Sequence, residues 1–117
     1  MLKIAYHHIY KHPLPEGHRF PMDKYELIPQ QLLHEGTCTA ENFFEPDVAD
    51  EAHILAVHTQ EYINDLKNQT LSKSAARKIG FPLSDTLVKR ESIITQGTIM
   101  ASEFALKYGI AMNIAGG

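Results

Sequence analysis

The histidines are the residues of this chain best suited to chemistry. Seven occur, and His7, His8, His12 and His18 lie together near the N-terminus. An imidazole can bind a transition metal or exchange a proton near neutral pH. His8 and His12 could chelate a metal on one face of a helix, but Pro13 argues against a helix there. We therefore expect loop and surface histidines that are hydrogen-bonded to backbone, and no metal site.

Other polar residues do not complete a catalytic set. His53 and His58 end a helical stretch, where a cationic side chain complements the helix dipole. Cys38 is the single cysteine, so a disulfide or a cysteine-based zinc site is excluded, and no neighbouring base activates its thiol. Phosphate-binding glycine loops and the Gly-x-Ser-x-Gly motif are absent. A histidine-rich metal carrier is a further hypothesis, which rests on the histidine count alone.

Length and composition limit the class of protein. The chain has 117 residues, 44% of them apolar and 21% charged, and a net charge of −3. These values are typical of one soluble globular domain, without the basic excess that nucleic-acid binding requires. No apolar run approaches the roughly 18 residues of a membrane span, and the first residues do not resemble a signal peptide. We expect a cytoplasmic protein that binds neither nucleic acid nor membrane.

Apolar periodicity predicts the elements that position these side chains. Strands are expected at 2–6, 43–44 and 110–114, and a long loop at 7–21. Helices are expected at 22–35, from 59, at 72–78 and from 84 or 85 to 108. A further short helix would carry Ala52, Leu55 and Ala56, with either Asp47 or Asp50 as its cap. Pro29 predicts a kink or an early break in the first helix. Strands separated by helices indicate an α/β fold with a parallel sheet and right-handed crossovers.

The long C-terminal helix carries small residues among its apolar ones. Ile93, Gly97, Met100 and Phe104 share one stripe of it. We expect this helix to pack closely against the sheet, with a serine or aspartate cap at its start and Gly109 at its end.

Several segments, in order along the whole chain, resemble the histone deacetylase superfamily. The segment 12–25, HPLPEGHRFPMDKY, is similar to its first loop and helix, above all in the class IV-like and bacterial branches, which include acetoin-utilisation proteins and acetylpolyamine amidohydrolases. The segment 57–62, VHTQEY, resembles its His-Thr-x-x-Tyr segment. GFP at 80–82 and GTIMA at 97–101 follow in the same order, and NIAGG at 113–117 is similar to the strand before its Gly-Gly-x-His-His motif.

The resemblance implies a fold and a chemistry. The fold is the N-terminal part of an arginase/deacetylase-like three-layer α/β/α fold with a parallel sheet, so residues 1–117 form an incomplete deacetylase-like domain. The activity is that of a zinc-dependent amidohydrolase, in which two aspartates and a histidine hold zinc and a tandem histidine pair transfers protons. This chain has no Asp-x-His motif, and no Gly-Gly precedes its adjacent pair His7-His8. We expect the catalytic residues and the zinc ligands beyond residue 117, and no cofactor within the chain.

The resemblance also implies residues near the product channel. Arg19 matches the arginine at the base of the pocket, where a guanidinium suits a carboxylate product; alternatively, it ties the loop to backbone carbonyls. Tyr6 and the following loop, which contains His18, correspond to the channel rim. Gly116 and Gly117 would let the backbone approach the channel.

These expectations lead to two functional hypotheses. In the first, the chain is an inactive N-terminal fragment of a hydrolase that deacetylates acetyl-lysine, acetylpolyamine or a related acylated amine. In the second, it is a free-standing, non-catalytic α/β binding or scaffold module derived from that fold. Because the predicted sheet edges are uncovered, we also expect the chain to self-associate.

Overall fold

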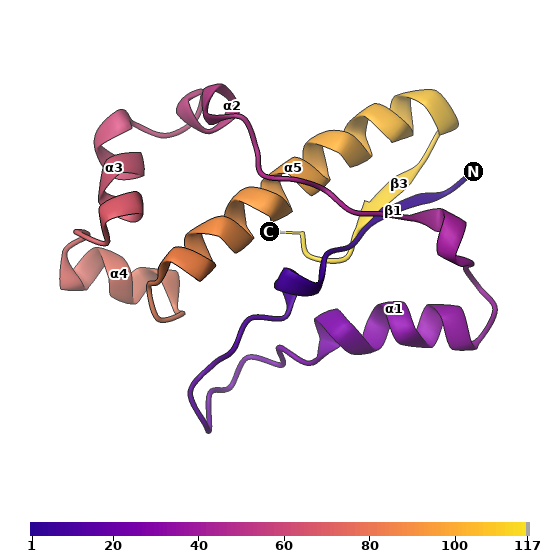
Figure 1. The fold of residues 1–117 in the computed structure, drawn as a ribbon, viewed down its shortest axis with the longest axis horizontal. Coiled ribbons are helices and arrows are strands. Elements are labelled where there is room, and N and C mark those ends of the chain that lie inside the picture. Colours follow the sequence, from indigo (N-terminus) through magenta and orange to yellow (C-terminus); the bar gives the residue numbers. More distant parts are fainter. Residues whose placement is uncertain (117) are drawn as a thin grey trace.

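The computed structural model describes residues 1–116, which form a flat α/β unit of 45 × 36 × 17 Å (Figure 1). Three short strands, β1 (Lys3–Ala5), β2 (Phe43–Phe44) and β3 (Ala111–Asn113), pair in parallel in the order β2-β1-β3. The predicted parallel sheet is therefore confirmed, and β1, the N-terminal strand, is its centre.

Helices make up most of the rest of residues 1–116. They are η1 (His8–Tyr10), α1 (Lys24–His34), η2 (Ala40–Asn42), α2 (Glu51–Leu55), α3 (Gln60–Asn68), α4 (Lys73–Ile79) and α5 (Asp85–Tyr108), where η marks a 3-10 helix. The caps agree with prediction: the Ser84 hydroxyl accepts a hydrogen bond from the Leu87 amide, and Gly109 ends α5 at φ 94°. Thr59 and Ser72 cap α3 and α4 in the same way.

Two local expectations were wrong in part. The loop predicted at 7–21 contains η1, whose start is capped by the His7 side chain. The early break offered as one alternative at Pro29 does not occur, because α1 continues to His34 although proline removes a helical N–H. The other alternative, a kink, stays a prediction. Tyr25 and Pro29 lie one turn apart and are both buried, and this packing offsets the lost hydrogen bond.

The long helix α5 covers one face of the sheet (Figure 1). Its buried residues are Leu87, Arg90, Ile93, Gly97 and Ala101; Met100 and Phe104 of the predicted stripe are only half-buried. A Cβ added at Gly97 would lie 2.6 Å from the Tyr10 hydroxyl and 3.2 Å from the Ala5 Cβ. The expected close contact between helix and sheet is confirmed, and it depends on the missing side chain of Gly97.

Part of the sheet remains uncovered in residues 1–116. Ile4 is in register with Met112, but Ile4 is 2% exposed and Met112 50% exposed. Leu106 and Ile110, near the end of α5 and the start of β3, are also exposed. An apolar surface beside an open strand edge is where self-association would occur, and that association stays a prediction. Among the described helices, none has the length and apolar character needed to cross a membrane.

Candidate functional site

The candidate site lies at the carboxyl edge of the sheet, where open α/β sheets usually bind their ligands. Because the three strands are parallel, the segments that follow them meet at this edge. The loop 6–12 follows β1, Glu45 follows β2, and the turn 114–116 follows β3. The parallel pairing therefore brings three distant parts of the chain together.

A hydrogen-bond network around Asn113 joins two of these segments to α5. The Tyr10 hydroxyl donates to Asn113 Oδ1 at 2.9 Å, and the same oxygen accepts from the Ala115 amide at 3.3 Å. Asn113 Nδ2 donates to the Ile94 carbonyl at 3.0 Å and to Thr98 Oγ1 at 3.1 Å. This one amide side chain thus holds the turn after β3 against both the loop and the helix.

A buried guanidinium holds the loop from the helix side. Arg90 is 3% exposed, and its Nε donates to the Tyr10 carbonyl at 2.8 Å. Its Nη1 donates to the Glu91 carboxylate at 2.6 Å. The guanidinium carbon lies 5.2 Å from the Tyr25 ring centroid and 5.8 Å from that of Phe81, distances suited to cation–π attraction.

Our sequence reasoning missed Arg90, although a signal was present. Arg90 lies three residues before Ile93 and seven before Gly97, so it shares their buried face. A charged residue on such a stripe needs a buried partner. Asn113 had no comparable signal, because its partners come from distant segments.

Burial raises the pKa of Tyr10 to about 12, although the Asn113 hydrogen bond and the Arg90 charge lower it in part. Because the pKa of Tyr10 is higher in the folded state than in the unfolded state, where it is near 10, the protonated phenol favours folding. This contribution to the free energy of unfolding is complete below pH 10 and is lost as the pH rises toward 12. We expect stability to fall more steeply from pH 10 to 12 in the native protein than in Tyr10→Phe. Urea unfolding at each pH measures this difference, and parallel curves would contradict it.

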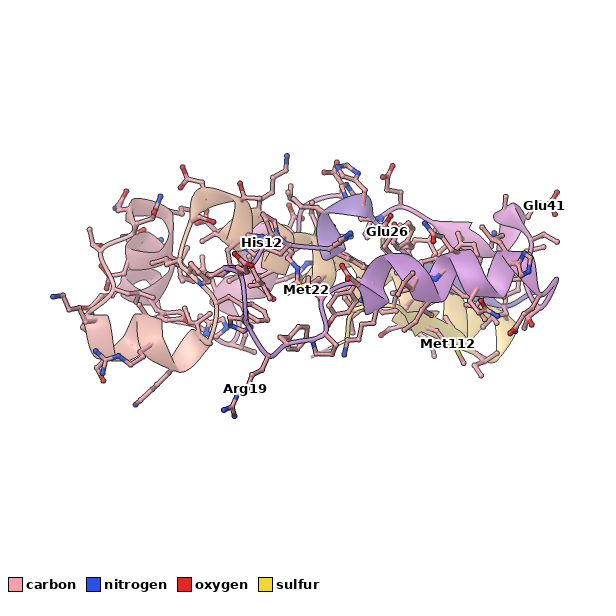
Figure 2. The ribbon with its side chains drawn as sticks, turned by 90° about the horizontal axis from the view of Figure 1, so that it is seen from below. His12, Arg19, Met22, Glu26, Glu41 and Met112 are labelled. Atoms are coloured by element: carbon pink, nitrogen blue, oxygen red, sulfur yellow. The ribbon has the colours of Figure 1, made fainter. Side chains whose placement is uncertain are left out.

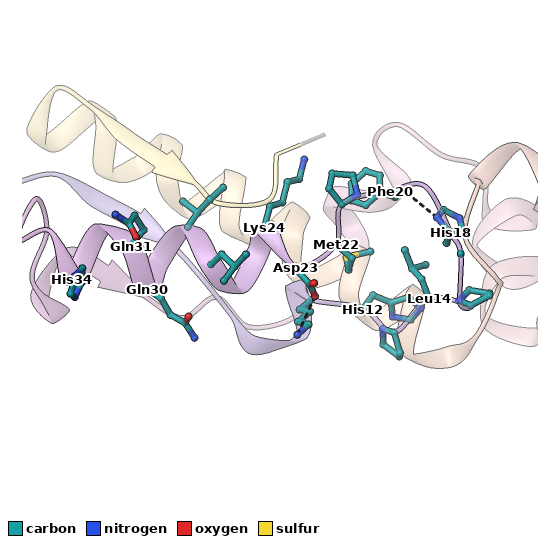
Figure 3. Close-up of a pocket in the computed structure, with 17 residues that line it drawn as sticks. His12, Leu14, His18, Phe20, Met22, Asp23, Lys24, Gln30, Gln31 and His34 are labelled. Atoms are coloured by element: carbon teal, nitrogen blue, oxygen red, sulfur yellow. Dashed lines mark hydrogen bonds and ion pairs between the residues drawn. The ribbon is translucent and has the colours of Figure 1, made fainter.

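Two cavities flank the loop 7–21. One, of about 850 Å³, is walled in part by Phe20, Tyr25, Phe81 and Arg90, and Gly116 reaches it. The other, of about 1020 Å³, runs along α1 and includes the side chains drawn in Figure 3. Both are largely apolar grooves into which a few polar groups project, as ligand-binding clefts commonly are.

The histidines of the loop behave differently from one another. His7 Nδ1 accepts from the Ile9 amide, and His18 Nδ1 accepts from the Phe20 amide, as expected. His12 is instead 5% exposed, and its Nδ1 is buried with no hydrogen-bond partner among the described residues. Burial lowers the pKa of His12 and the Arg90 charge lowers it further, while the Glu91 carboxylate opposes this shift.

The residues assigned to the product channel do not share one cavity. His18 lines the cavity along α1, whereas Gly116 lines the other. Tyr6 is half-buried and its ring makes edge-on contacts with the rings of Tyr10 and Phe43. Arg19 is exposed and projects from its loop away from the body of the molecule (Figure 2). The predicted Gly117 lies outside the described residues, and the roles of all five stay predictions.

Residues 1–116 do not supply the ligands of the zinc site that the resemblance implies. Among residues 1–116, the one group of three potential metal ligands with neighbouring ligand atoms is His7, His8 and Glu45. This set of two histidines and one glutamate differs from the two aspartates and one histidine that hold the catalytic zinc in the family. No step of a zinc-dependent reaction is therefore assigned to these residues.

The protein is thus a mixed α/β protein with a parallel sheet, and its candidate site lies at the carboxyl edge of that sheet. No protein-family model matches the chain. The chain is similar to an uncharacterized protein of Picosynechococcus sp., with 39% identity over 114 residues, which are 97% of this chain and 38% of that protein. It is also similar to histone deacetylase 2 of Arabidopsis thaliana, with 24% identity over 106 residues, 86% of this chain and 27% of that protein. The chain therefore spans well under half of either relative, and its similarity to the histone deacetylase is distant.

Proposed function

We propose that this chain is the N-terminal part of a zinc-dependent deacetylase of the histone deacetylase superfamily, on an arginase-like α/β/α fold. The whole protein would hydrolyse acetyl-lysine, acetylpolyamine or a related acylated amine. The observation that carries the proposal is the similarity to the Arabidopsis histone deacetylase over 86% of the chain. The parallel sheet packed against α5 supports it, because such a sheet suits an α/β hydrolase.

In this proposal, residues 1–116 build one side of the active-site framework. The Tyr10–Asn113 hydrogen bond and the Arg90–Tyr10 hydrogen bond hold the carboxyl edge in place. Residues beyond 117 would supply the zinc ligands and the proton-transferring histidines. Arg19 would pair with a carboxylate product once those further residues enclose it.

The proposal is tested on the protein encoded by the complete gene. We expect it to release acetate from an acetyl-lysine peptide or from N-acetylputrescine, to lose activity on treatment with EDTA and to regain it with zinc. Residues 1–117 expressed alone serve as the matched control, and we expect them to be inactive. A folded, zinc-supplied complete protein that releases no acetate from either substrate would refute the proposed activity.

The alternative is the non-catalytic α/β binding or scaffold module. A stop codon directly after Gly117 in the gene would favour that module, and a reading frame that continues into a His-His motif would favour the enzyme. Sequencing of the transcript distinguishes the two before any assay is run.

A further inference from the structure

The strongest candidate outside the proposed zinc chemistry is a side-chain cluster at the ends of β1 and β2. The first strand ends at Ala5 and the second at Phe44, and these two residues are in register. His7 and His8 follow the first strand, and Glu45 directly follows the second. Because the strands are parallel, all three side chains lie at the same edge of the sheet.

The three side chains are close enough to share one ion. His7 Nε2 lies 3.7 Å from the Glu45 carboxylate, and the rings of His7 and His8 are 4.5 Å apart between centroids. One ligand atom from each residue can be chosen so that all lie within 4.8 Å of one another. Ligands of a tetrahedral zinc ion lie about 3.4 Å apart, given metal–ligand distances near 2.0–2.1 Å. A small side-chain rotation is therefore enough.

A hydrogen bond holds the backbone next to the cluster, and two of the three side chains are exposed and therefore have room to rotate. The Tyr6 amide donates to the Phe44 carbonyl at 2.9 Å, which fixes the two segments directly before the cluster. The His8 and Glu45 side chains are exposed, so rotating them costs little packing. The His7 side chain is 16% exposed and has the most restricted position of the three.

We propose that His7, His8 and Glu45 form a binding site for one divalent transition metal ion, with zinc as the best match. Two imidazoles and one carboxylate form a ligand set that zinc accepts, with a fourth position open to water or another ligand. His8 and Glu45 are exposed, so the cluster is accessible from solvent. This proposal does not depend on the proposed deacetylase activity.

The groups around His7 affect both its protonation and a nearby cation. Burial lowers the pKa of His7; the Glu45 and Asp47 carboxylates oppose this shift, whereas His8 and the Lys89 ammonium add to it. A neutral imidazole is the form that binds a metal. The negative charges of Glu45 and Asp47 attract the cation, and Lys89 partly opposes them.

Metal binding at His7 would leave a specific signature. In the metal-free protein, His7 Nδ1 accepts a hydrogen bond from the Ile9 amide at 3.0 Å, so the proton of the neutral ring is on Nε2. When Nε2 binds the metal, the proton moves to Nδ1 and the ring stays neutral. The Ile9 amide then loses its acceptor, and its NMR signal shifts as zinc is added.

The test is a zinc titration of the protein encoded by the complete gene, with bound metal counted by mass spectrometry of the dialysed protein. We expect His8→Ala and Glu45→Gln each to weaken binding at this site at least tenfold and to remove one zinc per chain. Glu41→Gln and His53→Ala are matched controls, because both residues are exposed and lie outside the cluster. The controls should bind as the native protein does.

The outcome is separable from that of the proposed function. A catalytic zinc contributed by other residues would remain in His8→Ala and Glu45→Gln, so only the additional equivalent disappears. Equal zinc content and affinity in the native protein and both variants would overturn the proposal. An Ile9 amide signal that does not move during the titration would also overturn it, since His7 would then not be a ligand.

Discussion

Arg90→Ala is expected to destabilise the protein by about 2–4 kcal/mol, the range for a buried side chain with a backbone hydrogen bond. The change removes the donor to the Tyr10 carbonyl and the cation beside the rings of Tyr25 and Phe81. It also leaves a cavity where a side chain 3% exposed had packed. Urea unfolding monitored by circular dichroism measures the loss.

Glu91→Gln is the matched control for Arg90→Ala. The Glu91 side chain is 52% exposed, and an ion pair at such a site is worth less than about 1 kcal/mol. If Glu91→Gln cost as much as Arg90→Ala, the ion pair and not the Tyr10 carbonyl would be the important contact. Arg90→Lys keeps the charge but loses the planar donor group, so we expect an intermediate effect.

Gly97→Ala is expected to cost about 1–3 kcal/mol, the usual penalty for overpacking a filled core. Alanine normally stabilises a helix by up to about 1 kcal/mol relative to glycine. Here its Cβ would lie 2.6 Å from the Tyr10 hydroxyl and 2.8 Å from Asn113 Nδ2. Either the helix moves away from the sheet, or the Tyr10–Asn113 hydrogen bond breaks.

The matched control is Gly116→Ala, because a Cβ at Gly116 meets no atom within 4 Å. We expect its effect to stay within about 0.5 kcal/mol. Combining Gly97→Ala with Tyr10→Phe removes the atom nearest to the added Cβ. The double variant should therefore lose less stability than the two single variants lose in sum. Additive losses would place the strain elsewhere in the helix–sheet contact.

Local chemistry was enough to predict most of the elements. Ser84, Thr59 and Ser72 cap their helices because a hydroxyl can accept from an amide two or three positions along the same chain. Gly109 ends α5 because glycine adopts positive φ without strain. The parallel sheet followed from strands separated by helices. The resemblance in segments such as 12–25 also led to the histone deacetylase superfamily, and the distant similarity to the Arabidopsis enzyme supports this link.

Pro29 shows where one local expectation, an early break of the helix, failed. The proline rule predicts a kink or an early break, yet α1 continues to His34. The rule counts the missing hydrogen bond but not the burial of Tyr25 and Pro29, which arises only when the helix packs on the core. The expectation that His12 lies at the surface failed for the same reason. Its burial depends on how the loop folds back toward α5.

The sequence by itself determined the class of fold, the helix caps and the need for a small residue on α5. Tertiary structure decided which side chains meet. Tyr10 bonds to Asn113 across 103 positions of the chain, and His7 reaches Glu45 through the register of β1 with β2. Contacts of this kind depend on strand register and on the distance between helix and sheet, which no local pattern encodes. The Asn113 network and the proposed metal site therefore became visible only in the folded chain.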